Sequence, residues 1–364
     1  MIIKSLKLKN FRNYNFQELQ FDDNVNIFYG DNAQGKTNIL EAIYLCATTK
    51  SHRGRKDKEL IRFDCRESHI EMEIEKKEVP YKIDIHLKDN GPKGIAINKI
   101  PIKKASELFG IVNVIFFSPE DLNIVKNGPS ERRRFMDIEL SQLDRLYLSN
   151  LSNYNRVMNQ RNHLLKEINR NTNMNELEGT LDIWDMQLAK YGSEIVEKRK
   201  EFISKVNKII SKIHFTLSGN KEKVEIIYNI SGFPLSLEDN LRKNRERDIR
   251  MKSTSVGPHR DDLIFQIEDK DVKIYGSQGQ QRTTALSLKL SEIELVKESI
   301  KDTPILLLDD VLSELDHNRQ TYLLESIHDI QTLISCTGLD EFINYRFSVN
   351  KIFHVEKGSV VKEN

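Results

Sequence analysis

The sequence predicts a mixed α/β fold, in which a P-loop mixed sheet and an antiparallel β meander form a head with an inserted helical hairpin. Three observations support this prediction. Residues 30–37 form a Gly-x-x-x-x-Gly-Lys-Thr loop, residues 68–100 alternate apolar with polar side chains, and apolar residues recur near heptad spacing from about residue 130 to residue 218. These patterns are typical of phosphate binding, half-buried strands and paired helices, respectively.

Composition restricts the class of protein. The 364 residues leave room for two domains or one large interrupted domain, and 30% of them are charged. The net charge is only +1, so a nucleic-acid surface would have to be a local basic patch. The three cysteines are far apart in the sequence and predict core thiols of a reducing compartment. No apolar run is long enough to span a bilayer, so we expect a cytoplasmic protein.

The first predicted element is a strand at residues 2–8, where apolar and polar side chains alternate. The alternation of apolar and basic residues at the start of the chain is not that of a signal peptide. A polar turn follows at residues 10–14 and contains Arg12. This arginine either reaches a phosphate near the P-loop or is a solvated turn residue, and the sequence favours neither alternative.

The P-loop lies between a predicted strand at residues 24–29 and a predicted helix that begins at Thr37. Gly30 and Gly35 let the backbone take positive φ and approach a ligand closely, so that loop N–H groups converge on phosphate oxygens at a helix N-terminus. Lys36 can reach the β- and γ-phosphates, and the Thr37 hydroxyl can ligate Mg²⁺. We therefore expect ATP and Mg²⁺ as cofactors.

A dense basic loop follows the P-loop helix at residues 50–58. Charge runs are usually solvated, but beside a nucleotide site this one can contact phosphates of ATP or of DNA. The candidate DNA-binding residues are Arg53, Arg55 and Lys56, with Lys58 and the run Arg132–Arg134 as further candidates.

The meander at residues 68–100 contains an Asn90-Gly91 hairpin turn. A buried strand is expected at residues 112–117, followed by a helix start at Ser118-Pro119. Two long helices are then expected to fold back on each other across a polar break at residues 169–175. Their apolar stripes indicate either a partner-binding surface or a simple helix–helix core, and the core is the favoured interpretation.

The rest of the chain continues the head. Strand-like alternation resumes at residues 224–230, and a basic helix with a solvated face is expected at residues 236–252. The segment 256–263 superficially resembles a kinase catalytic loop, but no Asp-Phe-Gly accompanies it, so we expect a structural ion-pair cluster. Residues 275–282 open a helix that extends to about residue 300, and its N-terminus can present a hydroxyl and backbone N–H groups to an anion.

The second half of the nucleotide site is the buried strand at residues 304–308, which ends in two carboxylates. This is a Walker B motif. Asp309 can hold Mg²⁺, and Asp310 can orient or deprotonate the attacking water.

Together these motifs resemble the ABC-type ATPase heads of the SMC-type family of DNA repair ATPases. The resemblance rests on residues 10–14, 30–42, 118–122, 132–137, 256–263, 277–282 and 308–316, and so covers nearly the full chain in order. It implies that residues 1–117 and 222–364 fold as one discontinuous head, with residues 118–221 inserted as a helical arm.

The resemblance also implies a mechanism. Two protomers would sandwich two ATP molecules, and Ser277 of one would touch the γ-phosphate held by Lys36 of the other. The homodimer would bind DNA at gaps or junctions of duplex with single strand, and would help RecO- and RecR-type mediator proteins to load recombinase. Asp310 is one methylene shorter than the usual glutamate, which suggests slow hydrolysis. The implied nucleotide contacts are Arg12, Gly30, Asp31, Asn32, Ala33, Gln34, Gly35, Lys36, Thr37, Asn38, Ser277, Gly279 and Gln280, with Gln278 as a further catalytic residue.

Three other functions compete with this one. A transporter ATPase subunit coupled to a membrane partner would need a short helical subdomain, whereas the sequence predicts a long arm. An ATP-driven nuclease would need an additional acidic metal cluster, because Asp309 and Asp310 are already committed to Mg-ATP. A purely structural scaffold would not need intact P-loop and Walker B residues.

Overall fold

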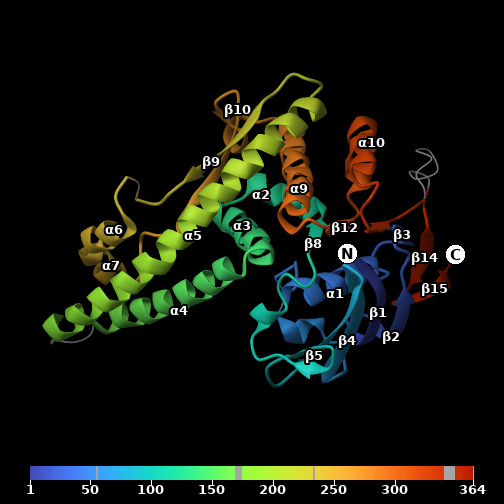
Figure 1. Cartoon of the computed structure of the whole chain (residues 1–364), viewed down its shortest axis with the longest axis horizontal. Coiled ribbons are helices and arrows are strands. Elements are labelled where there is room, and N and C mark those ends of the chain that lie inside the picture. Colours follow the sequence, from blue (N-terminus) through green and yellow to red (C-terminus); the bar gives the residue numbers. More distant parts are fainter. Residues whose placement is uncertain (55, 169–173, 233, 340–348, 364) are drawn as a thin grey trace. The chain divides into compact units, whose positions relative to one another are not determined.

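The computed structural model describes residues 1–54, 56–168, 174–232, 234–339 and 349–363. The chain divides into two compact units (Figure 1). The first unit contains Met1–Asp121 and Leu288–Asn364, and the second contains Leu122–Ser287. No helix among the described residues is both long and apolar enough to cross a membrane.

The boundaries of these units differ from the expected ones, because residues 222–287 belong to the second unit and not with the head. The reason lies in contacts between β9 (Val224–Asn229) and α5 (Met174–Leu217). The Asn207 side chain on α5 donates from Nδ2 to the Ile226 carbonyl and accepts from the Ile226 N–H, both at 2.8 Å. The backbone of β9 is therefore hydrogen-bonded to a side chain of the arm helix α5.

The first unit contains a mixed sheet that carries the P-loop and the Walker B strand. Its strand order is β15-β14-β3-β13-β12-β8, and all neighbours are parallel except β14 with β15. The central strands are almost wholly buried, as expected for parallel strands covered on both faces, and β12 is apolar without interruption up to Asp309. The strands are β3 (Val25–Tyr29), β8 (Val114–Phe117), β12 (Ile305–Asp309), β13 (Thr332–Cys336), β14 (Lys351–Glu356) and β15 (Ser359–Glu363).

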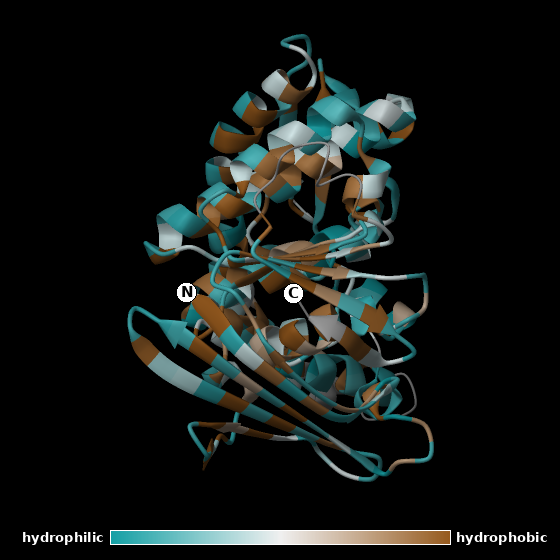
Figure 2. Ribbon diagram, turned by 90° about the vertical axis from the view of Figure 1, so that its right-hand side faces the viewer, coloured by the Kyte–Doolittle hydropathy of each residue, from teal (hydrophilic) through white to brown (hydrophobic). Residues whose placement is uncertain are grey.

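The predicted meander is the second sheet of this unit, with strand order β2-β1-β4-β5-β6-β7 and antiparallel pairing throughout. Hydrophobic and hydrophilic residues alternate along its strands (Figure 2). Ile70 and Met72 are buried, while Glu73 is exposed. Its strands are β1 (Ile2–Phe11), β2 (Tyr14–Gln20), β4 (Glu67–Lys76), β5 (Val79–Lys88), β6 (Gly94–Ile97) and β7 (Ile100–Pro101).

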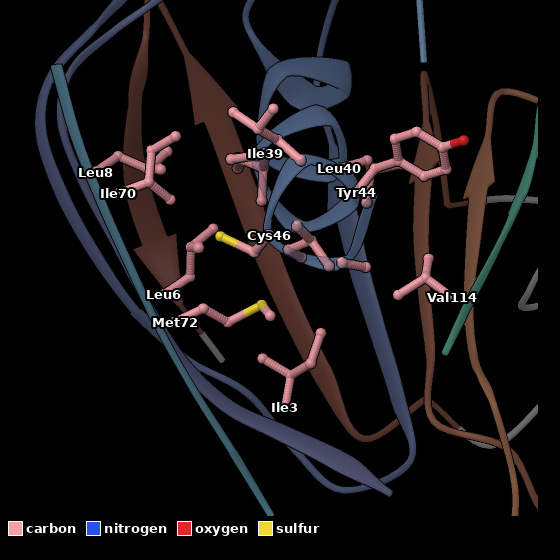
Figure 3. Close-up of a cluster of buried hydrophobic side chains, with 14 of the residues drawn as sticks. Ile3, Leu6, Leu8, Ile39, Leu40, Tyr44, Cys46, Ile70, Met72 and Val114 are labelled. Atoms are coloured by element: carbon pink, nitrogen blue, oxygen red, sulfur yellow. The ribbon is translucent and has the colours of Figure 1, made fainter. Parts of the chain in front are cut away.

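Helix α1 (Lys36–Thr48) packs its apolar side chains into a core that both sheets share (Figure 3). Ile39 and Cys46 from this helix meet Leu6 of β1 and Met72 of β4 in the same buried cluster. Fully burying one such side chain contributes about 1.5–3 kcal/mol, so this core fixes the helix that follows the P-loop. The prediction of core thiols is confirmed for Cys46 and Cys336, whereas Cys65 is half-buried. Burial raises the pKa of the Cys46 thiol.

Short elements complete the first unit. They are η1 (Asp57–Leu60), η2 (Ala105–Glu107), η3 (Pro119–Asp121), η4 (Leu312–Glu314) and α10 (His317–Ser326).

The second unit is built around two helices that lie side by side, α4 (Arg145–Ile168) and α5 (Figure 1). The first expected long helix is in fact two, because α3 (Pro129–Leu143) ends before Asp144 and α4 begins after it. The Asp144 carboxylate accepts the N–H groups of Leu146 and Tyr147 at 2.8 and 3.1 Å, and so caps α4. Residues 169–173 of the expected polar break lie outside the described residues.

The remaining elements of the second unit follow in chain order. The expected basic helix at residues 236–252 is two short helices that meet at Asn244. The elements are α2 (Leu122–Lys126), α6 (Leu237–Lys243), α7 (Arg245–Met251), β10 (Asp262–Ile267), β11 (Lys270–Asp271), α8 (Val272–Tyr275) and α9 (Gln278–Ile300), which continues into the first unit. Strands β11, β10 and β9 form a small antiparallel sheet.

The apolar stripes of α4 and α5 form a helix–helix core, as the favoured interpretation predicted. Leu164, Leu165, Ile168 and Leu181 are buried together in one cluster, against which Trp184 packs. The stripes therefore stabilise the arm itself.

Two arginines are buried among these helices with carboxylate partners. The Arg161 guanidinium donates to Asp185 at 2.6 Å and to Asp248 at 2.7 Å, and its side chain is fully buried. Arg199 donates to Asp137 at 2.7 Å and to the Pro258 carbonyl at 2.7 Å. Both arginines tie helices of the arm to segments that follow it in the chain.

The expected ion-pair cluster at residues 256–263 is confirmed for its two aspartates. Asp262 accepts two hydrogen bonds from Arg132, at 2.6 and 3.0 Å. Asp261 is buried, accepts from the Tyr228 hydroxyl and lies 3.7 Å from Arg199. Arg260 instead donates to the Thr254 carbonyl at 3.1 Å. This segment is therefore structural within the second unit.

Candidate nucleotide-binding site

The P-loop connects β3 to α1, and its two glycines are required by the geometry. Gly30 has φ +146°, and a Cβ there would lie 2.4 Å from the Val355 carbonyl oxygen. Gly35 has φ +119°, and a Cβ there would lie 2.6 Å from Asn13 Nδ2. Both conformations are ones that residues with a side chain rarely adopt. The loop is thus folded tightly against its neighbours, with Asp31, Asn32 and Ala33 exposed at its tip.

The turn at residues 10–14 supports the P-loop from one side. Asn13 Nδ2 donates to the Gln34 carbonyl at 2.9 Å, and Asn13 Oδ1 accepts from the Asn38 side chain at 2.8 Å. The Tyr14 hydroxyl donates to the Gly35 carbonyl at 3.1 Å. Sequence reasoning assigned Gln34 and Asn38 to the nucleotide but missed the support from Asn13 and Tyr14, although both belong to a motif on which the resemblance rests.

A second support comes from the β14–β15 hairpin. The Lys357 N–H donates to the Gln34 side-chain oxygen at 2.7 Å, and the Gly358 N–H donates to the Gln34 carbonyl at 2.9 Å. Gln34 is therefore held through both its backbone and its side chain. No local sequence pattern predicts this contact, since the partners are more than 300 residues apart in the chain.

Replacing Asn13 with alanine is expected to weaken ATP binding about tenfold, because the P-loop loses two hydrogen bonds that hold its shape. Titration with a fluorescent ATP analogue measures the effect. Asn15→Ala is the matched control, because Asn15 is exposed on the same hairpin. An unchanged affinity in Asn13→Ala would show that the loop keeps its shape without this support.

Lys36 is positioned where phosphate is expected. Its side chain is buried, and Nζ donates to the carbonyls of Gly30 and Asp31 at 2.7 and 2.9 Å. The ammonium group is thus held over the loop at the N-terminus of α1, where the helix dipole also favours an anion.

The predicted metal ligands lie together. The Thr37 hydroxyl donates to Asp309 Oδ1 at 2.7 Å, and Asp309 is itself buried at the end of β12. A hydroxyl and a carboxylate are hard oxygen donors, which suit Mg²⁺. Ser335 on the neighbouring strand β13 donates to the same carboxylate oxygen at 2.7 Å and so orients it. Sequence reasoning missed Ser335, whose position is set by the pairing of β12 with β13.

Asp310 follows Asp309 in a left-handed backbone conformation, with φ +52°. Its N–H is bonded to the Ser335 carbonyl and hydroxyl oxygens at 3.2 and 3.1 Å. Burial, and then the charge of Asp309, raises the pKa of the Asp310 carboxyl, while Lys36 opposes the shift. A carboxylate with a raised pKa is a better proton acceptor, which suits the expected role as base.

Arg12 is engaged by Glu41 rather than directed at the P-loop. Its guanidinium makes two hydrogen bonds to this buried carboxylate, at 2.8 and 2.9 Å, and a third to the Glu59 carbonyl at 2.9 Å. Burial alone would raise the pKa of Glu41, but the hydrogen bonds from Arg12 and Ser51 outweigh it, so the pKa is lowered. A contact between Arg12 and phosphate stays a prediction, and it would need this pair to rearrange.

The basic loop begins beside this pair. The Ser51 hydroxyl donates to Glu41 at 2.5 Å and accepts from the Arg53 N–H at 3.1 Å. Arg53 and Lys56 are exposed, as a surface that meets DNA requires, whereas Arg55 lies outside the described residues. Glu41, which sequence reasoning did not single out as a site residue, thus connects α1 to the start of the loop.

The predicted signature residues lie in the second unit, at the start of α9. Ser277, Gln278 and Gly279 are exposed. Ser277 Oγ accepts from the Gln280 N–H at 3.2 Å, and Gln280 Oε1 accepts from the Ser277 N–H at 2.8 Å, which makes a reciprocal capping box. The hydroxyl of Ser277 remains at an open helix N-terminus.

The P-loop, the Walker B strand beside β13, the meander and the helical arm together define an ABC-type ATPase head of the SMC class. The family model described as the RecF/RecN/SMC N terminal domain matches residues 2–359. The chain belongs to this family and, within it, to the RecF proteins.

Relatives and solved structures agree with this assignment. The DNA replication and repair proteins RecF of Lachnospira eligens and Agathobacter rectalis are 63% and 61% identical, over 100% and 99% of both chains. A solved structure of the recombination mediator protein RecF-ATP in the RecFOR pathway is 37% identical with a TM-score of 0.92, over 100% of this chain and 97% of that one. An Smc head domain from Pyrococcus furiosus shares only the fold, at 18% identity, a TM-score of 0.57, and coverage of 100% and 96%.

Proposed function

We propose that this protein is an ATP-dependent DNA-binding protein of replication and recombinational repair. It dimerises around ATP, clamps DNA at gaps or junctions of duplex with single strand, and helps RecO- and RecR-type mediators to load recombinase. Slow ATP hydrolysis then releases the clamp. The observation that carries the proposal is the arrangement of Lys36, Thr37 and Asp309 around the glycine loop, in a chain similar over its full length to RecF proteins.

The residues of the site divide the chemistry among them. Lys36 exchanges its two carbonyl partners for phosphate oxygens and balances their charge. Thr37 and Asp309 would hold Mg²⁺, which would supply charge neutralisation for the phosphates of ATP. Asp310 accepts a proton from the attacking water.

The signature residues act on the nucleotide of a second protomer. Ser277 offers its hydroxyl and the N-terminus of α9 to the γ-phosphate, and Gln278 and Gly279 complete this contact. The exposure of all three residues supports the proposal, because the contact needs a surface open to a partner.

Fluorescence anisotropy of a labelled gapped duplex tests the proposal. The duplex is titrated with protein in ATP and Mg²⁺, then in ADP, and again with Lys36→Arg. We expect tight binding only when ATP is present and Lys36 is intact. Binding that ignores the nucleotide would separate the P-loop from DNA binding, and no binding in any state would reject the DNA clamp.

The basic loop is expected to contact DNA phosphates. Replacing Arg53, Arg55 and Lys56 with alanine should then weaken binding similarly for all sequences, and should flatten the plot of log affinity against log salt by about 0.9 for each duplex phosphate that the variant no longer neutralises. A control that replaces Lys9, Lys99 and Lys103 removes the same charge from exposed positions on the meander. Equal slopes in the two variants would remove the loop from the DNA interface.

A further inference from the structure

The signature motif is connected to the base of the helical arm by a chain of side chains that the proposed mechanism does not use. Gln280 Nε2 donates to Glu222 Oε1 at 2.9 Å, while the Oε1 of the same glutamine accepts from the Ser277 N–H. Both ends of the Gln280 amide are therefore engaged, and this fixes the direction in which the amide points. Gln280 thus transmits the position of Glu222 directly to the backbone of Ser277.

Glu222 is in turn held by residues of α5 and the turn that follows it. Its second carboxylate oxygen lies 3.4 Å from His214 Nε2, and its N–H donates to the Ser218 hydroxyl at 3.1 Å. Its side chain is 28% exposed, so it lies at the edge of the unit and not in the apolar core. Glu222 is therefore held through its backbone N–H by Ser218, while its carboxylate accepts the hydrogen bond from Gln280.

His214 is fully buried in the last turn of α5 and contacts α9 with its other nitrogen. Nδ1 lies 3.1 Å from the Ser287 hydroxyl oxygen, and that hydroxyl donates to the Thr283 carbonyl at 2.7 Å. Since the serine proton is used in this way, the serine oxygen accepts from the Nδ1–H of His214. The imidazole ring is therefore held at Nδ1 by α9, and its Nε2 lies 3.4 Å from a carboxylate oxygen of Glu222.

We propose that Glu222 is a positioning residue that sets the presentation of Ser277 to the nucleotide of a second protomer. The proposal rests on the proposed function, in which Ser277 contacts that nucleotide. Without Glu222, the Gln280 side chain would regain rotamer freedom, and that freedom would have to be lost again when the dimer closes. The chain of contacts also joins the long arm helix to the signature motif, so a shift of the end of α5 would change the position of Ser277.

Two measurements on the full chain test the proposal, with Glu222→Ala as the disrupting variant. Hydrogen exchange of the amides of residues 277–281 in the free protein should be about two- to tenfold faster. The protein concentration for half-maximal ATP-dependent dimerisation, measured by sedimentation velocity, should rise about tenfold, because each dimer contains two such sites. ATP-analogue binding and the thermal unfolding midpoint should stay at the wild-type values.

The controls separate positioning from a general structural effect. Glu222→Gln keeps an oxygen that accepts from Gln280, so it should restore both measurements to near wild type. Glu225→Ala removes an exposed carboxylate three residues further along the same segment and should behave as wild type. Exchange and dimerisation in Glu222→Ala that match Glu225→Ala would overturn the proposal. If the wild-type protein does not dimerise with ATP, the proposed function fails instead, and the exchange measurement alone decides whether Glu222 positions Ser277.

Discussion

Asparagine in place of Asp310 is expected to lower ATP turnover by about a hundredfold or more, because the site loses its proton acceptor. The substitution keeps the size of the side chain and leaves Asp309, Thr37 and Lys36 in place. ATP binding and ATP-dependent dimerisation should therefore persist, and dimers should last longer because hydrolysis no longer releases them. Turnover is measured by phosphate release and dimer lifetime by sedimentation after the removal of free ATP.

The pH dependence of turnover is a second test of Asp310 as the proton acceptor. The base must be ionised, and burial beside Asp309 raises the pKa of Asp310 above the ordinary value for an aspartate. Turnover should therefore fall on acidification, as Asp310 becomes protonated. Asp310→Glu should keep this acid limb, whereas Asp310→Asn should lose it along with the activity. Wild-type turnover in Asp310→Asn would assign the proton acceptor to another group.

The parts of the site that follow from short sequence patterns could be predicted. The glycines, Lys36 and Thr37 lie within eight residues, and the strand before Asp309 is continuously apolar. Each of these patterns determines its own local structure. Only glycine readily adopts the backbone conformation of the tight loop, and a continuous apolar run is typical of a strand that is buried on both faces.

Contacts between distant segments could not be predicted in the same way. The position of Ser335 beside Asp309 depends on which strand pairs with β12. The hydrogen bonds from Arg12 to Glu41 depend on how the turn at residues 10–14 folds over α1. Arg12 illustrates the difficulty. Its sequence context left open a phosphate contact or a solvated turn, and neither alternative included the buried carboxylate of Glu41, which accepts its hydrogen bonds.

The arm shows the same limit. Its apolar stripes predicted paired helices, and these are present. The break at Asp144 and the assignment of residues 222–287 to the second unit were not predicted, because both depend on polar side chains that bind backbone groups of another element. Heptad spacing describes only the apolar face, so it does not contain this information.

The buried arginines are therefore expected to matter more to the arm than its apolar pattern suggests. Replacing Arg161 with alanine should lower the free energy of unfolding of the second unit by about 3–5 kcal/mol, because Asp248 is left buried without its partner. Asp185 suffers less, since Arg245 also donates to it, at 2.7 Å. Trp184 is the single tryptophan of the chain and packs against the apolar cluster of α4 and α5, so its fluorescence during urea unfolding reports on this unit.

Two further variants establish that the loss of stability comes from the uncompensated charge. Arg156→Ala removes an exposed arginine from the same helix and should change the free energy of unfolding by less than about 0.5 kcal/mol. Adding Asp248→Asn to Arg161→Ala removes the stranded charge, so the double variant should be more stable than the sum of the single losses predicts. Strictly additive losses would mean that Arg161 does not stabilise the arm through Asp248. A coupling between the two sites would show instead that the charged pair joins α4 to α7, and so fixes the segment that follows the arm against its long helices.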